Sequence, residues 1–131
     1  MSQVLSMATM MKELLGRTPV GSAVPDLKVH GTLLRKPCLF RKASKEGFFP
    51  LKKADYLVFY TNGCGRCEET LAAARALADN KSKVLLVNMD TLLETYPEQA
   101  RTLLDTFDLS GLPHVLRLGP GGVVQHMYLE L

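Results

Sequence analysis

Two short apolar segments separated by one helical stretch constrain the fold of this chain more than any other feature. Tyr56–Tyr60 is an aromatic and β-branched run without polar alternation, and Val84–Asp90 is a second strongly apolar run. Such runs are typical of strands that are buried on both faces. The alanine-rich segment Cys64–Asp79 lies between them and has Glu68 and Glu69 in its first turns, where acids favour the helix dipole. The three segments predict a strand–helix–strand unit with parallel strands.

The residues after this unit continue the alternation of helix and strand. Tyr96–Phe107 predicts a helix with Pro97 in its first turn. Its inward-facing residues are expected to be Leu103, Leu104 and Phe107. Two strands, His114–Leu118 and Val123–Leu129, are predicted on either side of a glycine-rich turn. The fold class is therefore α/β, with a central mixed β-sheet flanked by helices and an antiparallel edge.

The N-terminal third has a less regular pattern. Residues 3–15 have apolar residues at helical spacing, and residues 18–26 form an extended entry segment punctuated by proline and glycine. The chain is divided into an N-terminal helix and linker (1–19), expected to be the tail of an upstream region, and one domain (20–131). Within the domain we expect a strand at Leu27–His30, a turn at Gly31, a hairpin pairing Thr32–Leu34 with Cys38–Phe40, and a loop at Lys42–Lys53.

Composition and charge exclude several classes of protein. Hydrophobic residues make up 47% of the chain and charged residues 22%, which excludes intrinsic disorder. No uncharged apolar run reaches about 18 residues, so we expect no direct membrane insertion. Met1–Gly16 lacks the basic start and apolar core of a secretory signal, so we expect either a cytoplasmic protein or a trimmed piece of a longer precursor. Residues 1–53 carry ten Lys and Arg against three acids, but no aromatic stacking array accompanies them, so no nucleic acid partner is expected.

The pair Cys64 and Cys67 carries the clearest chemical signal. A C-x-x-C motif at the start of a helix brings the two sulfurs close enough to form and break a disulfide with little backbone movement. The helix N-terminus favours a thiolate at Cys64, and the positive charge of Arg66 adds to this effect. Cys67 lies one turn further in and should be less exposed, which suits a resolving role. A C-x-x-C motif near a βαβ unit is a known redox signature.

Three other interpretations of the pair stay open. A zinc site would need two further ligands, and the other candidates are scattered along the chain: His30, His114, His126 and Cys38. A purely structural disulfide would close too small a loop to stabilise the fold much. Two idle thiols would leave the strand–turn–helix placement unexplained. Cys38 itself is expected to be an inert apolar residue, with a regulatory disulfide to the motif as the alternative.

Three segments together resemble the thioredoxin superfamily: Tyr56–Cys67 (YLVFYTNGCGRC), Leu85–Asp90 (LLVNMD) and Phe107–Gly122 (FDLSGLPHVLRLGPGG). They look like the family's core strand with its active site, the next strand, and the cis-proline loop with its hairpin. Val20–Gly31 (VGSAVPDLKVHG) is similar to the entry segment of the TlpA/ResA-like branch. The resemblance covers residues 20–131 and implies a thioredoxin-like fold.

The resemblance also implies the site. Cys64 and Cys67 would be the catalytic residues, supported by Gly65, Arg66, Leu112 and Pro113, with a cis bond before Pro113. The Leu112 backbone would pair with an extended substrate strand. His114 is either a general base or an ordinary half-buried histidine. No metal or cofactor is implied. The partners would be protein thiols and disulfides and a redox partner protein, in the periplasm or cell envelope, with the chain a monomer.

The chain departs from the family pattern at several positions. The tryptophan that usually precedes the first cysteine is Gly63, and Gly65-Arg66 replaces the Gly-Pro dipeptide, which implies a less reducing couple. The buried carboxylate of many thioredoxins is Val58 here, and the lysine of the next strand is Leu86. These departures favour the rival hypothesis of a thioredoxin-like binding module with a vestigial cysteine pair, whereas the cysteine motif and its placement lead us to expect a thiol–disulfide oxidoreductase.

Overall fold

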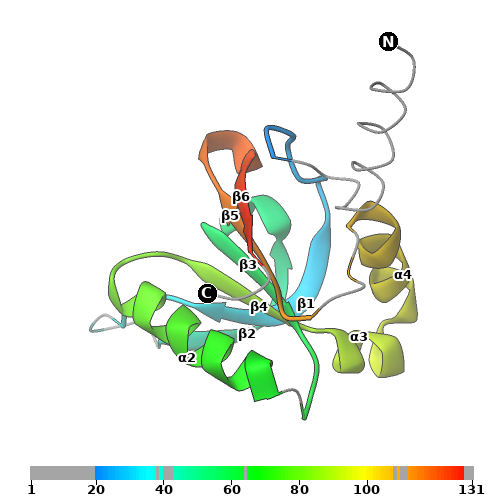
Figure 1. The fold of residues 1–131 in the computed structure, drawn as a ribbon, viewed down its shortest axis with the longest axis horizontal. Helices are drawn as coiled ribbons and strands as arrows, with labels where there is room; N and C mark the ends of the chain where they lie inside the picture. The colour runs from blue at the N-terminus through cyan, green and yellow to red at the C-terminus, as the bar shows by residue number, and fades with distance from the viewer. Residues whose placement is uncertain are drawn as a thin grey trace.

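The chain forms an α/β structure built on one mixed six-stranded sheet (Figure 1). The computed structural model describes residues 20–37, 39, 43–63, 65–107, 109 and 112–128. The strand order is β2-β1-β4-β3-β5-β6, and three helices accompany the sheet in this described part. The strands are β1 (Lys28–Leu34), β2 (Ser44–Pro50), β3 (Tyr56–Tyr60), β4 (Val84–Asn88), β5 (His114–Leu118) and β6 (Val124–Tyr128), and the helices are α2 (Gly65–Asp79), α3 (Met89–Thr95) and α4 (Pro97–Thr106).

The parallel pair β3–β4 lies at the centre of the sheet. The two strands are in register from Tyr56 opposite Val84 to Tyr60 opposite Asn88, and α2 connects them. The predicted strand–helix–strand unit is therefore confirmed, including both bounds of β3. Burial of both faces explains the missing alternation, since Leu57, Val58 and Phe59 are all fully buried.

Alternate side chains of the central strands pack into two separate hydrophobic cores, one on each face of the sheet. Leu57 and Phe59 of β3 belong to the larger core, which also contains apolar residues of α3 and α4. Val58 belongs to a smaller core on the other face, which contains Ala74 and Ala78 of α2. Strand side chains point alternately to the two faces, so one residue of β3 supports α2 while its neighbours support α3 and α4. Each fully buried large side chain contributes about 1.5–3 kcal/mol.

The C-terminal hairpin forms the antiparallel edge that the sequence predicts. β5 pairs with β3 and also with β6, and both pairings are antiparallel. Pro120–Gly122 forms a short 3-10 turn between β5 and β6, and Gly121 has a φ of 74°, a conformation that glycine adopts without steric cost.

The first hairpin differs from its prediction. β1 does not turn at Gly31 but runs straight through it, and its partner is β2, with Val29 opposite Phe49. Lys42–Lys53, expected to be a loop, contains this strand and a 3-10 turn at Leu51–Lys53. β2 is an edge strand with mostly exposed residues, so its sequence carries Ser, Lys and Glu instead of an apolar run.

Two helical details also differ from prediction. Met89 and Asp90, expected to extend the strand, start α3, because the Asn88 side chain accepts hydrogen bonds from the backbone N–H groups of Asp90 and Thr91 and caps the helix. Leu104 of α4 is 46% exposed, while Leu103 and Phe107 are buried as predicted. The expected helix at 3–15 and the expected strand residues Cys38 and Phe40 lie outside the described residues, and Leu39 between them is in a turn.

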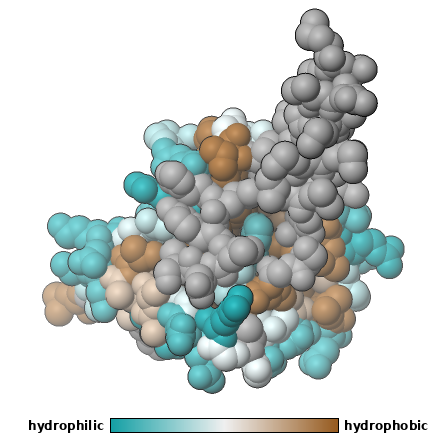
Figure 2. Space-filling view, in the orientation of Figure 1, coloured by the Kyte–Doolittle hydropathy of each residue, from teal (hydrophilic) through white to brown (hydrophobic). Residues whose placement is uncertain are grey.

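Figure 2 shows one face of the molecule, on which hydrophilic and apolar residues are interspersed. In Figure 2 the visible apolar residues form small separate patches between hydrophilic ones. In the part of the chain that the structure describes, no helix combines the length and the apolarity needed to cross a membrane.

Gly31 allows a close approach between β1 and β4, and this contact is open to a direct test. A Cβ atom at Gly31 would lie 2.6 Å from the Leu86 carbonyl oxygen, whereas one at Gly47, its partner on β2, would lie 3.5 Å or more from its nearest neighbours. We expect Gly31→Ala to lower the free energy of unfolding by about 1–3 kcal/mol, because backbone must move. Gly47→Ala should change it by less than about 1 kcal/mol. Urea unfolding measures both, and equal midpoints for the two variants would contradict the assignment.

Candidate active site

The C-x-x-C motif lies where the chain leaves β3 and enters α2. Tyr60 ends β3, residues 61–63 form a short turn, and Gly65 is the first residue of α2. Because β3 and β4 are parallel, the carboxyl ends of both strands meet at this edge of the sheet. Cys64 lies outside the described residues, so the expectations for its thiolate and for the effect of Arg66 on it stay predictions.

A small polar network ties the turn before Cys64 to the end of β4. The backbone N–H of Asn62 donates a hydrogen bond to Asp90 Oδ2 at 2.8 Å. The Asn88 side chain donates to Asn62 Oδ1 at 3.0 Å and, through its own oxygen, caps α3. Two hydrogen bonds, one to Asp90 and one from Asn88, thus fix Asn62 and the turn that contains it. Sequence analysis missed this network, although an Asn followed two residues later by Asp is a helix-start signal.

Cys67 lies on the inner face of α2, in its first turn. Its exposed fraction is 1%, whereas Gly65 and Arg66 just before it are exposed. Cys67 is thus almost fully shielded from solvent, and its predicted difference in exposure from Cys64 stays a prediction. Ala74 lies two turns further along the same helix face and packs in the smaller core. Cys67 accordingly faces the sheet, where a sulfur is shielded from solvent.

The loop before β5 reaches the same edge of the sheet. His114 pairs with Phe59 in the antiparallel register of β3 and β5, so Pro113, one residue earlier, lies level with the end of β3. The peptide bond between Leu112 and Pro113 is cis, as expected for this position. Pro113 is buried and Leu112 is half-buried. The structure thus brings Leu112 and Pro113 to the end of the sheet from which α2 begins.

His114 lies on the opposite face of the sheet from α2. It is 7% exposed, and its ring centroid is 6.2 Å from that of Phe59, which belongs to the larger core. Alternation along β5 gives Val115 to the α2 face and His114 to the other. His114 is therefore a buried histidine on the far face, and its position does not favour the general-base role.

The smaller core under α2 is apolar at the positions that the family pattern makes ionisable. Val58 is fully buried and Leu86 is 5% exposed, and both pack in this core. Beneath α2 the described side chains of this core are aliphatic, apart from two half-buried tyrosines, Tyr56 and Tyr60. No carboxylate or ammonium group reaches Cys67 from positions 58 and 86.

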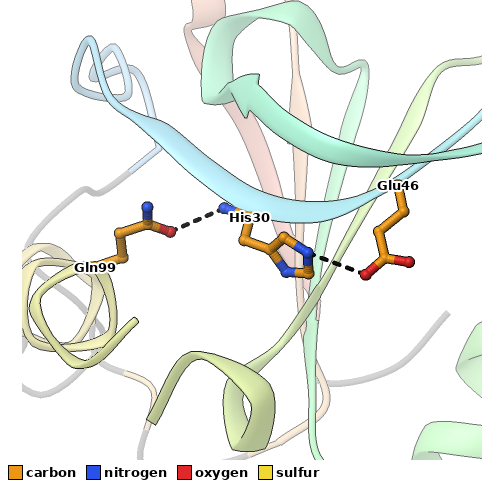
Figure 3. A network of polar contacts seen from close by, with 3 residues as sticks. All are labelled: His30, Glu46 and Gln99. Atoms are coloured by element: carbon orange, nitrogen blue, oxygen red, sulfur yellow. Dashed lines mark hydrogen bonds and ion pairs between the residues drawn. The ribbon is translucent and has the colours of Figure 1, made fainter. Parts of the chain in front are cut away.

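A second polar cluster lies between the first hairpin and α4 (Figure 3). His30 Nε2 is 3.1 Å from Glu46 Oε1, and Gln99 accepts a hydrogen bond from the His30 backbone N–H at 2.9 Å. The His30 ring also stacks on Tyr96, with centroids 5.1 Å apart. These contacts join β1, β2 and α4, which is a structural role. Among the described residues, no three His, Cys, Asp or Glu side chains are grouped as a metal site requires.

An open, polar concavity of about 530 Å³ lies at the amino end of β3. Tyr56 and Arg117, which are opposite each other in the β3–β5 register, line it together with Asp55. This end of β3 is opposite to the end that carries the cysteine motif, so the concavity is separate from the candidate active site.

Comparison with known proteins identifies no relative. No family model matches the chain, and neither a curated protein nor a solved structure matches it significantly.

The bond from Asn62 to Asp90 should protect the turn before Cys64. In Asp90→Ala the Asn62 amide loses its acceptor, and we expect its hydrogen exchange to become about tenfold faster, because a hydrogen bond to a charged group contributes about 1.5 kcal/mol or more. Asp90→Asn keeps an acceptor oxygen at the same position and should retain most of the protection. Amide exchange followed by NMR measures this, and identical Asn62 rates in all three proteins would rule the network out.

Proposed function

We propose that this chain is a thioredoxin-like domain that exchanges thiols and disulfides with protein partners through Cys64 and Cys67. The order of its elements supports this proposal. The cysteine motif follows the buried strand β3, the next strand β4 lies beside β3, and the proline loop leads into the hairpin β5–β6 on the other side of β3. These are the segments, in the same order, that carry the resemblance to the family.

The position of Cys67 is the observation on which the proposal depends most. It lies in the first turn of a 15-residue helix that follows a buried strand across a short turn, and it is almost fully shielded. The first turn of a helix presents unpaired N–H groups and a partial positive charge, which lower the free energy of a nearby thiolate. A shielded second cysteine and a first cysteine at the helix start are what a nucleophile and its resolving partner need.

The proposed reaction has two steps. The Cys64 thiolate attacks one sulfur of a substrate disulfide, and the other substrate sulfur leaves as a thiolate. The Cys67 thiolate then attacks the Cys64 sulfur of the mixed disulfide, and the remaining substrate sulfur leaves. The substrate gains two electrons and two protons, and the domain keeps the Cys64–Cys67 disulfide. The reaction needs no metal or organic cofactor, because a redox partner protein reduces the pair again.

The setting follows from the TlpA/ResA-like resemblance. We propose that the domain acts in the periplasm or cell envelope, as a monomer. Gly65 and Arg66 between the cysteines favour a couple less reducing than that of thioredoxin, since a stabilised thiolate makes the disulfide a stronger oxidant. Leu112 and Pro113 would line the site that receives the extended substrate strand.

The alternative is a binding module with a vestigial cysteine pair. The apolar residues Val58 and Leu86 favour it, because family members use ionisable groups there to move the proton of the buried cysteine. A binding module would hold a client without turning over disulfides.

Trapping of mixed disulfides separates the two functions. In Cys67→Ser the first attack proceeds but resolution cannot, so we expect disulfide adducts on Cys64 to accumulate and to be visible by non-reducing electrophoresis and mass spectrometry. Cys64→Ser should form no adduct, and neither variant should reduce insulin above background. Cys38→Ser is the matched control and should behave as the unaltered chain. A chain that neither reduces insulin nor gives adducts in Cys67→Ser would be the binding module.

A further inference from the structure

The hydroxyl of Thr70 is buried without a hydrogen bond. Thr70 is 1% exposed, and its Oγ1 is the buried side-chain polar atom that has no partner among the described residues. Two threonines of α4 behave differently. Thr102 and Thr106 of α4 donate to the carbonyl oxygens four residues before them, at 3.0 and 2.7 Å. The Thr70 hydroxyl does not make this bond. Burying it without a partner therefore costs free energy.

The position of Thr70 relates it to Cys67. The two residues are three apart on α2, both are buried, and both lie on the face that continues through Ala74 to the smaller core. Residues three apart on a helix have Cβ atoms about 5–6 Å from each other. Helical side chains also lean toward the N-terminus, so the Thr70 side chain leans toward the turn that contains Cys67. Threonine populates two χ1 rotamers in helices, and its hydroxyl can turn without backbone movement.

We propose that the Thr70 hydroxyl donates a hydrogen bond to the Cys67 sulfur when that sulfur is ionised. Thr70 is then a positioning residue for the resolving step, and this role rests on the proposed function. Cys67 must attack as a thiolate, and an apolar site raises the free energy of a buried thiolate. The hydrogen bond from the hydroxyl offsets part of the free energy of burying this thiolate. Val58 and Leu86 are apolar and cannot stabilise the thiolate in the same way.

The step is balanced without any further group. Cys67 loses its proton, and its thiolate forms the bond to Cys64 while the bond from Cys64 to the substrate sulfur breaks. The departing substrate thiolate takes up one proton. The Thr70 hydroxyl keeps its own proton throughout and returns to its unbonded state when the disulfide has formed.

Other titratable and charged groups near Cys67 are few in the described part. On α2 itself Arg66, Glu68 and Glu69 are exposed and lie off the inner face. From the sheet, the groups packed on this side are aliphatic, with the phenols of Tyr56 and Tyr60 as the titratable exceptions. His114 lies on the opposite face, and Cys64 is the remaining thiol of the motif. The test therefore removes Cys64 and leaves the other groups unchanged.

The test measures the ionisation of Cys67 alone. In the full-length Cys38→Ser/Cys64→Ser chain Cys67 is the single thiol, and its thiolate absorbance can be followed against pH. Adding Thr70→Val should raise the midpoint by about one pH unit, a tenfold lower acid dissociation constant, because the donor to the charged form is lost. Thr70→Ser should restore the midpoint, and Thr102→Val on α4 is the matched control that should leave it unchanged.

Each outcome has one meaning for the proposal. A raised midpoint in Thr70→Val that Thr70→Ser reverses supports it, even if trapping fails and the oxidoreductase function is wrong. An unchanged midpoint in Thr70→Val overturns it, even if mixed disulfides are trapped and the function stands. A raised midpoint in Thr70→Ser as large as in Thr70→Val also overturns it, because the effect would then come from packing. Unfolding at a pH below the midpoint should be no easier for Thr70→Val, since the hydroxyl has no partner beside a neutral thiol.

Discussion

The parallel pairing of β3 with β4 is the constraint on which the rest of the structure depends. It requires a crossover, which α2 supplies, and it brings the carboxyl ends of both strands to one edge of the sheet. The turn at Asn62, the start of α2 and the cap of α3 all meet at this edge. The antiparallel pairing of β5 with β3 adds the loop of Leu112 and Pro113 to the same place. The direction of three strands thus brings three separate segments of the chain to the candidate site.

The two unequal cores explain why α2 differs from the other helices. α3 contributes Met89 and Leu92 to the larger core and α4 contributes Leu103, whereas α2 contributes small residues such as Ala74 and Ala78 to the smaller one. Small residues let a helix lie close to the sheet, which shields Cys67. The same close packing buries the Thr70 hydroxyl without a hydrogen-bond partner. This unsatisfied hydroxyl lies one helical turn from Cys67, whose thiolate would accept its hydrogen bond in the proposed reaction.

The sequence predicted the central strands and the C-terminal hairpin of the sheet, and the errors elsewhere have physical causes. The apolar runs at β3 and β4 are local signals, because burial on both faces leaves an uninterrupted pattern. The sequence does not predict β2, because this edge strand is mostly exposed and carries the polar residues that are also typical of loops. A lone glycine such as Gly31 is also typical of turns, but here its lack of a side chain allows a close approach to the Leu86 carbonyl oxygen. The links from Asn62 to Asn88 and Asp90 join residues 26 and 28 positions apart, and no local pattern reports such a contact.

The central claim is that Cys64 and Cys67 form one reversible redox couple. Equilibration of the chain in glutathione buffers of graded potential, followed by mass spectrometry of the alkylated cysteines, measures this directly. The account predicts a single two-electron transition that involves Cys64 and Cys67 together, at a potential less negative than about −270 mV, the value of thioredoxin. Two cysteines that stay reduced, or that react separately with glutathione without ever pairing, would contradict it.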